Sequence, residues 1–227
     1  MEECISVFDM LKIGVGPSSS HTLGPWRAAE RFLEELRQDF DLNSITRVKV
    51  DLYGSLSLTG KGHATDLAVM LGLSGQDPEY IPVQDIDGII KAIENNHLIQ
   101  LGNEKALPFY ILQDIVFHKE FLPFHANGLT FTAFFENETE YASTFYSIGG
   151  GFVVKEERSN AKKKIAIKCA FPFPINNAAE LLDYTQKENK SISEIVYANE
   201  ISMRPEAEVH SELLRIWHTM LECMYIG

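Results

Sequence analysis

Residues 23–52 read LGPWRAAERFLEELRQDFDLNSITRVKVDL, and this segment decides the fold class. In its first half, apolar side chains recur at spacings of three and four: Trp26, Ala29, Leu33 and Leu36. That period predicts an amphipathic helix from Leu23 to about Gln38. In its second half, apolar residues alternate with Lys49 and Asp51, which predicts a strand that ends at Gly54.

The remaining segments extend this mixture of helices and strands in both directions along the chain. Helices are predicted over 64–71, 85–95, 178–186, 192–199 and from 205 to the end. Strands are predicted over 111–117, 129–135, 141–146 and 151–156, which are rich in aromatic and branched residues. The order predicts an α+β fold with a mixed or antiparallel sheet and helices packed on it. Trp26 and Trp217 lie on apolar helix faces and are expected in the core.

The composition bounds the class of protein. The chain has 227 residues, of which 45% are hydrophobic, so it is long enough for a buried core. Its net charge of −12 disfavours nucleic acid and anionic membranes as partners. No segment approaches the ~18 uncharged apolar residues of a membrane span. The N-terminal residues 1–4 are acidic where a signal peptide is basic, so we expect a cytoplasmic protein.

The three cysteines, Cys4, Cys169 and Cys223, are far apart, and no C-x-x-C spacing occurs. Neither a zinc knuckle nor an iron–sulfur ligand set can be built from them. We interpret them as reduced, structural thiols.

The segment from Gly14 to Pro25 has the strongest functional signal. Two glycines and a proline shape a loop, and three serines, His21 and Thr22 follow at the start of the predicted helix. A helix N-terminus offers free N–H groups and partial positive charge, and a histidine moves protons near neutral pH. The pattern indicates an anion cradle with an acid–base group. The alternative is a serine-rich loop, with Ser20 or Thr22 capping the helix, and a surface histidine.

Two glycine-containing clusters are further candidates. In Thr59–Asp66, Lys61 and His63 could face an anion, or the segment could be an ordinary strand-to-helix turn. In Ser147–Gly151, three consecutive glycines expose backbone N–H groups, which could line a site or only form a bend.

The segment Leu122–Gly128 places His125 and Asn127 two residues apart, so on an extended chain both would point the same way. Because Asn127-Gly128 also favours a turn, a purely structural role is equally open. The other histidines are interpreted as surface or core residues: His97, His118, His210 and His218.

Two nucleotide-binding patterns are rejected. Gly14-x-Gly16-x-x-Ser19 has no preceding strand and lacks the third glycine of a dinucleotide loop. Gly54 to Lys61 is one residue too long for a phosphate-binding loop, and Gly62 stands where a magnesium-binding hydroxyl is needed.

Taken together, the clusters resemble one family, the iron–sulfur L-serine dehydratases. The resemblance starts with Ser6–Asp9 and Gly14–Pro25 and continues through Thr59–Asp66, where Ala64 replaces the family's usual glycine. It extends through 124–128, where Ala126 replaces a proline, and through 149–152 and 204–208. It covers essentially the whole chain.

The resemblance implies conversion of L-serine to pyruvate and ammonia by a lyase of serine degradation. In this family a 4Fe-4S cluster polarises the substrate hydroxyl, a protein base removes the α-proton, and pyridoxal phosphate is not used. Residues 1–203 would be the substrate-binding β domain, and residues 204–227 a helical connection. The cluster would be held by an α domain, in cis or in trans, that this chain lacks. We expect a homodimer.

The resemblance also implies roles for single residues. His21 is the expected base, and His125 would share in proton transfer or orient the substrate. Ser19, Ser20 and Thr22 would hold the serine carboxylate, and Asn127 would orient the substrate. Lys61 and His63 would support the anion.

Two other functions remain open. The chain could be a stand-alone regulatory module that binds serine or a small carboxylate, since similar β domains resemble a regulatory domain of serine-pathway dehydrogenases. It could also be an interaction domain whose helices dock a partner. A histidine inside the serine run favours the catalytic reading over simple carboxylate binding.

Overall fold

The computed structural model describes residues 5–16, 18–59, 64–156 and 171–226. The chain divides into two compact units, residues 14–160 and residues 1–13 with 161–227. The sequence led us to expect a border between residues 203 and 204, at the end of the substrate-binding domain. That functional border is a different division from this structural one and stays a prediction. In the described ranges, no helix has both the length and the apolar character that crossing a membrane requires.

A five-stranded sheet forms the centre of the larger unit. Its strands are β1 (Ile45–Leu52), β4 (Ile115–Phe117), β5 (Gly128–Phe135), β6 (Glu140–Gly149) and β7 (Phe152–Lys155). The spatial order is β4-β1-β5-β6-β7. The β1–β4 pair is parallel, whereas the pairs β1–β5, β5–β6 and β6–β7 are antiparallel. The sheet is therefore mixed, which confirms the predicted α+β class.

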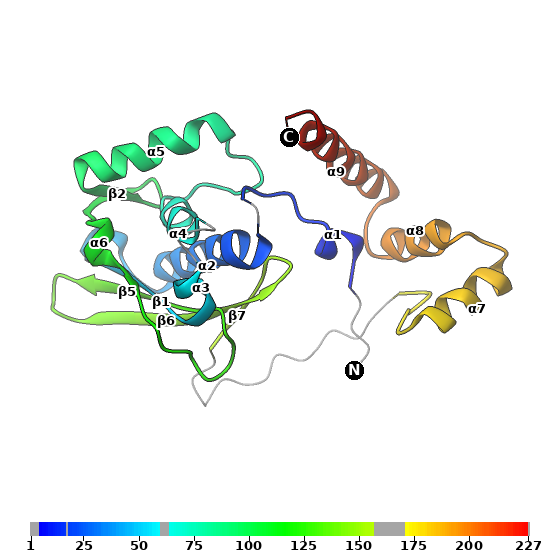
Figure 1. Cartoon of the computed structure of the whole chain (residues 1–227), viewed down its shortest axis with the longest axis horizontal. Helices are drawn as coiled ribbons and strands as arrows, with labels where there is room; N and C mark the ends of the chain where they lie inside the picture. The colour runs from blue at the N-terminus through cyan, green and yellow to red at the C-terminus, as the bar shows by residue number, and fades with distance from the viewer. Residues whose placement is uncertain (1–4, 17, 60–63, 157–170, 227) are drawn as a thin grey trace. The chain divides into compact units, whose positions relative to one another are not determined.

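Helices α2 (Gly24–Asp39) and α4 (Thr65–Leu73) lie side by side over one face of this sheet (Figure 1). The predicted face of α2 is buried as expected, with Trp26, Leu33 and Leu36 almost fully removed from solvent. Phe32 stacks on Phe131 of β5 at 5.2 Å between ring centroids. Each such side chain contributes about 1.5–3 kcal/mol relative to its exposed state. The core thus lies between α2 and the sheet.

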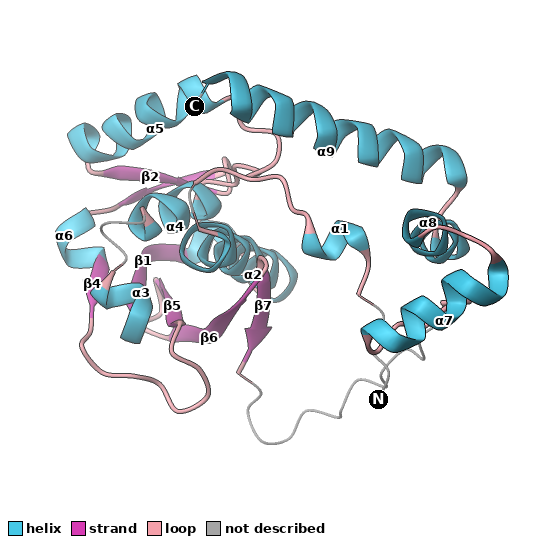
Figure 2. Cartoon of the chain, turned by 45° about the vertical axis from the view of Figure 1, so that its right-hand side comes forward, coloured by secondary structure: helices cyan, strands magenta, loops and turns pink. Residues whose placement is uncertain are grey.

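A two-stranded hairpin, β2 (Leu98–Leu101) and β3 (Lys105–Pro108), follows α5 (Val83–Asn96) (Figure 2). The sequence did not lead us to expect it. Gly102 and Asn103 both have positive φ, as the central residues of a type I′ turn require. The Gly-Asn pair between two short alternating runs was therefore an available signal for this hairpin.

The strand predicted over 111–117 is wrong in its first half. Residues Ile111–Asp114 form a short helix, α6, and only Ile115–Phe117 pair as β4. Asp114 is buried, and its carboxylate accepts the Tyr110 N–H at 2.6 Å and the Arg47 guanidinium at 2.6 Å. These bonds close a helical turn, and the one to Arg47 comes from a distant strand that the local apolar run does not reveal.

The second unit is helical. It contains α1 (Val7–Met10), α7 (Ala178–Glu188), α8 (Ile192–Met203) and α9 (Glu206–Ile226). Its best-buried charge is Glu200, which accepts hydrogen bonds from the Ser6 hydroxyl, the Val7 N–H and Arg204 at 2.7–3.0 Å. This network ties the N-terminal segment to α8.

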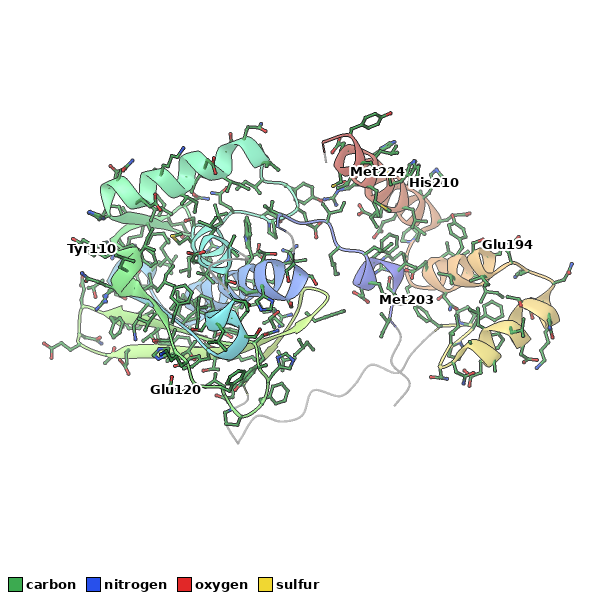
Figure 3. The ribbon with its side chains drawn as sticks, in the orientation of Figure 1. Tyr110, Glu120, Glu194, Met203, His210 and Met224 are labelled. Atoms are coloured by element: carbon green, nitrogen blue, oxygen red, sulfur yellow. The ribbon has the colours of Figure 1, made fainter. Side chains whose placement is uncertain are left out.

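The expected burial of Trp217 is wrong. Its side chain is 50% exposed on α9, and Leu214, Met220 and Met224 of the same helix are exposed as well. Met224 and His210 of this helix are labelled in Figure 3. The period of α9 is correct for an amphipathic helix, but a large part of its apolar surface remains uncovered within this chain.

Candidate active site

The serine run does not form a loop with a side-chain cap, as one reading of the sequence suggested. Ser19–Leu23 form one turn of π-helix, η1, that leads directly into α2. The N-cap residue Ser18 makes no side-chain cap bond, and the Gly24 N–H donates to the Ser19 carbonyl. Ser20 and Thr22 therefore lie inside helical backbone rather than capping it. Short π-helical turns recur at functional sites. We call residues 18–23 the serine turn.

His21 is held from both sides by hydroxyl groups. Its Nδ1 lies 2.9 Å from the Ser20 Oγ, and its Nε2 lies 3.0 Å from the Ser55 Oγ. Its backbone carbonyl accepts the Thr65 hydroxyl at 2.7 Å, which ties the serine turn to the start of α4. Because a hydroxyl can donate or accept, either neutral tautomer of His21 can be satisfied at both nitrogens.

Ser55 was missed by the sequence analysis. It lies in α3 (Gly54–Leu58), the short helix that follows β1, and its role depends on a partner 34 residues away. Its N–H donates to the Ala126 carbonyl at 2.9 Å, next to His125. Ser55 therefore bridges the two histidines, with His21 on its side chain and the His125 segment on its backbone. A Gly-Ser pair at a strand end was the only local signal.

His125 and Asn127 are joined to each other and to the sheet. The Asn127 N–H donates to the His125 Nδ1 at 3.1 Å, and the buried Asn127 amide donates to the Ser147 carbonyl at 3.1 Å. The Ser147 hydroxyl in turn donates to the Ser20 carbonyl at 2.8 Å. Three of the four clusters selected from the sequence, 14–25, 122–128 and 147–151, thus meet in one hydrogen-bonded network. The fourth cluster, 59–66, joins this network through the bond of Thr65 to the His21 carbonyl.

Gly24 is required where this network crosses from the serine turn to β6. A Cβ atom at this position would lie 2.0 Å from the Ser147 Oγ and 2.7 Å from its Cβ. Only glycine lets the two segments approach this closely.

The remaining predicted site residues differ in their surroundings. Ser19 is exposed, whereas Thr22 is buried and its hydroxyl donates to the Ser18 carbonyl, so it supports the turn itself. Lys61 and His63 lie outside the described residues. The roles assigned to all eight residues stay predictions.

The aromatic ring of Tyr146 supports the segment that carries His125. Phe124 packs against it at 4.9 Å between centroids, and the buried Tyr146 hydroxyl donates to Glu156 at 2.7 Å. Burial, followed by the hydrogen bond and negative charge of Glu156, raises the pKa of Tyr146 to about 12.

We expect the raised pKa of Tyr146 to make stability depend on pH. Between about pH 10 and 12 the folded chain keeps a proton that the unfolded chain loses, so the free energy of unfolding falls as pH rises. Urea unfolding of wild type and Tyr146→Phe is measured across this pH range. The free energy of unfolding should decline less steeply with pH in the variant. Tyr225→Phe, at an exposed position, is the control and should follow wild type. Equal slopes for wild type and Tyr146→Phe would contradict the assignment.

The described residues offer no ligand set for a 4Fe-4S cluster. Cys223 is the only cysteine among them and is exposed on α9, while Cys4 and Cys169 lie outside the described ranges. No three His, Cys, Asp or Glu side chains in those ranges gather as metal ligands would. Because such clusters are held by cysteine thiolates, we assign none to this part of the chain.

Comparisons with known proteins agree with the motifs. A family model described as the serine dehydratase beta chain matches residues 6–158. The chain is 39% identical to an L-serine dehydratase of Haemophilus influenzae, over 98% of this chain and 49% of the relative. It is 40% identical to L-serine dehydratase 1 of Escherichia coli, with the same coverage, and 40% identical to an L-serine dehydratase of Streptomyces coelicolor, over 98% and 50%.

The chain spans about half the length of these curated relatives. The family model covers the whole described sheet and the network around His21, His125 and Asn127. The resemblance drawn from the motifs is therefore confirmed, and the chain belongs to the serine dehydratase beta chain family.

Proposed function

We propose that this chain is the substrate-binding half of an L-serine dehydratase, which converts L-serine to pyruvate and ammonia. The observation that carries the proposal is the network that joins His21 to both the serine turn and the segment of His125 and Asn127. It joins the start of a helix to two histidine rings in a member of this family, and these groups are suited to hold an anion and to transfer a proton.

The serine turn supplies the groups that bind the substrate carboxylate. The serine turn stands at the start of the helical segment that continues into α2, and its Thr22 N–H donates to the Ser18 carbonyl at 2.8 Å. The positive end of the helix dipole and the serine hydroxyls favour a carboxylate at this position.

The hydrogen bonds of the two histidines indicate which one accepts a proton and which one donates one. The His125 Nδ1 accepts from the Asn127 N–H, so the neutral ring carries its proton on Nε2 and acts as a donor. His21 contacts a hydroxyl through each ring nitrogen, and these hydroxyls can reorient when its proton moves. His21 is thus the better base for the α-proton of serine, and His125 the better donor to the substrate.

The proposed reaction balances without an external oxidant or reductant. His21 takes the α-proton, the β-hydroxyl leaves as water after gaining a proton, and the C–C double bond of aminoacrylate forms. The tautomeric imine then takes up water and releases ammonia and pyruvate. No step is assigned to a cluster on this chain, and we propose that the cofactor is held by the half that the chain does not span.

The exposed apolar side chains of α9 support a partner for this chain. Leu214, Trp217, Met220 and Met224 are between 43% and 65% exposed, which is unusual for large apolar residues clustered on one helix. We propose that the cluster-bearing half covers them. The expected homodimer stays a prediction, which light scattering of the chain would test.

An anaerobic pyruvate assay tests the proposed function. The chain is supplied with L-serine after iron–sulfide reconstitution, alone and together with a separately produced cluster-bearing half. Pyruvate formation only in the mixture is the expected result. Pyruvate formation by the chain alone would contradict the proposal that the cofactor is held by the other half. No activity in either sample, with both proteins folded and serine bound by the chain, would favour the regulatory binding module.

A further inference from the structure

His118 lies outside the network described above, but it begins the loop that carries His125 and Asn127. We call residues 118–127 the His125 loop. Both ends of this loop are fastened near the end of β1 by backbone bonds. The His118 N–H donates to the Leu52 carbonyl and the Gly54 N–H to the Glu120 carbonyl, at 2.9 and 2.8 Å, and the Ser55 N–H holds the far end at Ala126. Glu120 is labelled in Figure 3 at the outer edge of the unit.

The side chain of His118 adds a second anchor at the same point. Its Nε2 lies 2.6 Å from the Asp51 Oδ1, and its ring stacks on Tyr53 at 4.6 Å with an interplanar angle of 11°. Asp51 is only 7% exposed and also accepts Lys49 Nζ at 2.8 Å. A buried carboxylate oxygen that accepts from two side chains holds both of them firmly, because losing a donor leaves part of its hydrogen bonding unsatisfied in a buried position.

The residues that follow Asp51 hold both candidate catalytic histidines. Tyr53 stacks on His118, Gly54 bonds the loop backbone, and Ser55 contacts His21 through its hydroxyl and Ala126 through its N–H. A shift of His118 would therefore move the loop relative to Ser55, and so move His125 relative to His21. Displacements of about 1 Å can cost on the order of 10²-fold in rate.

We propose that His118, held by Asp51 and Tyr53, is a positioning residue that fixes the His125 loop against Ser55 and so aligns His125 with His21. The kinetic part of this inference rests on the proposed function, whereas the structural part concerns only this chain. The bonds of His118 run to β1 and Tyr53 rather than to the serine turn. The proposal therefore predicts an effect on proton transfer rather than on carboxylate binding.

The structural part is tested by nitrogen NMR of the histidine rings in the 227-residue chain, with His125 assigned through His125→Gln. In wild type the His125 Nδ1 and Nε2 signals should be those of the Nε2–H tautomer, because Nδ1 accepts from Asn127. His118→Phe keeps the stacked ring but removes the bond to Asp51, and the two His125 signals should move toward each other. His118→Gln restores a donor and should return them.

The kinetic part uses the chain reconstituted with the cluster-bearing half. His118→Phe should lower kcat about tenfold or more and leave KM within about twofold, while His118→Gln should recover most of kcat. His97→Asn is the matched control, because His97 also stacks on a tyrosine, Tyr110, but lies away from the loop, and it should leave kcat unchanged.

If the His125 nitrogen signals are unchanged in His118→Phe, the proposal is wrong whatever values of kcat are measured. The proposal is also wrong if the signals change but kcat does not. If no protein turns serine over, the proposed function fails and the NMR result alone decides the positioning role. If His118→Phe does not fold by circular dichroism, Asp51→Asn, which keeps the size of the side chain, takes its place with the same expected shifts.

Discussion

In the reconstituted enzyme, replacing His21 with alanine is expected to lower kcat by about 10²–10⁴-fold, the usual contribution of a general base. This corresponds to about 3–5 kcal/mol of lost transition-state stabilisation. The reason is geometric: the His21 ring links the serine turn to Ser55, and its two hydroxyl partners can follow a proton on either nitrogen. The measurement is pyruvate formation under saturating L-serine.

Imidazole added to the buffer distinguishes lost chemistry from lost structure. The His21→Ala variant leaves space for a free imidazole beside Ser20 and Ser55, so the additive should recover part of the turnover if the ring acts as a base. His97→Asn, which removes a histidine outside the network, should behave as wild type with and without the additive. Turnover of His21→Ala within about threefold of wild type, under about 1 kcal/mol, would exclude the assignment.

The sequence predicted best those elements in which a regular spacing of apolar residues continues over many consecutive positions. The helix over 23–38 rests on apolar residues spaced by three and four, and the structure has α2 at Gly24–Asp39. The predicted strand up to Leu52 likewise corresponds to β1. In both cases the side chains that define the pattern are the ones that are buried in the core.

Two of the errors come from contacts that no local pattern contains. Residues 111–117 are apolar at five of seven positions, as in a strand, but Asp114 closes residues 111–114 into a helical turn with a distant arginine. Trp217 follows the helical period of α9, but period alone cannot tell whether a partner surface covers the helix. Local reasoning therefore could not supply the tertiary pairing of Asp114 or the exposure of the apolar side chains of α9.

In the candidate site too, local patterns reveal some residues, whereas contacts between distant segments reveal others. His21, His125 and Asn127 could be selected from the sequence because their residue types and neighbours indicate chemistry. Ser55 and His118 could not, because their importance arises from pairing across the fold, with His21 and with Asp51. Residues proposed to carry the reaction have recognisable local motifs, whereas residues that hold those motifs in place are visible only in the fold.

Gly54 holds the site together, and replacing it with alanine is expected to destabilise the larger unit by about 2–5 kcal/mol, the sum of two effects. Its φ of +54° belongs to the left-handed region, which costs an alanine about 1–2 kcal/mol. A Cβ atom would also lie 2.3 Å from the Ala126 carbonyl oxygen and 2.7 Å from the Phe121 ring. Overpacking of this kind adds about 1–3 kcal/mol.

Gly88 provides the matched control for Gly54→Ala. It lies inside α5, and a Cβ atom there would have no neighbour within 4 Å, so Gly88→Ala should stabilise the chain by about 0.5–1 kcal/mol. Both variants are measured by urea unfolding in a Trp217→Phe background, where the fluorescence of buried Trp26 reports on the larger unit alone. In Gly54→Ala we expect the Ala126 carbonyl to retreat, which would break its bond to the Ser55 N–H and displace the loop that carries His125. If Gly54→Ala were as stable as wild type, the loop would have room to move, and the contacts at the end of β1 could not be what aligns the two histidines.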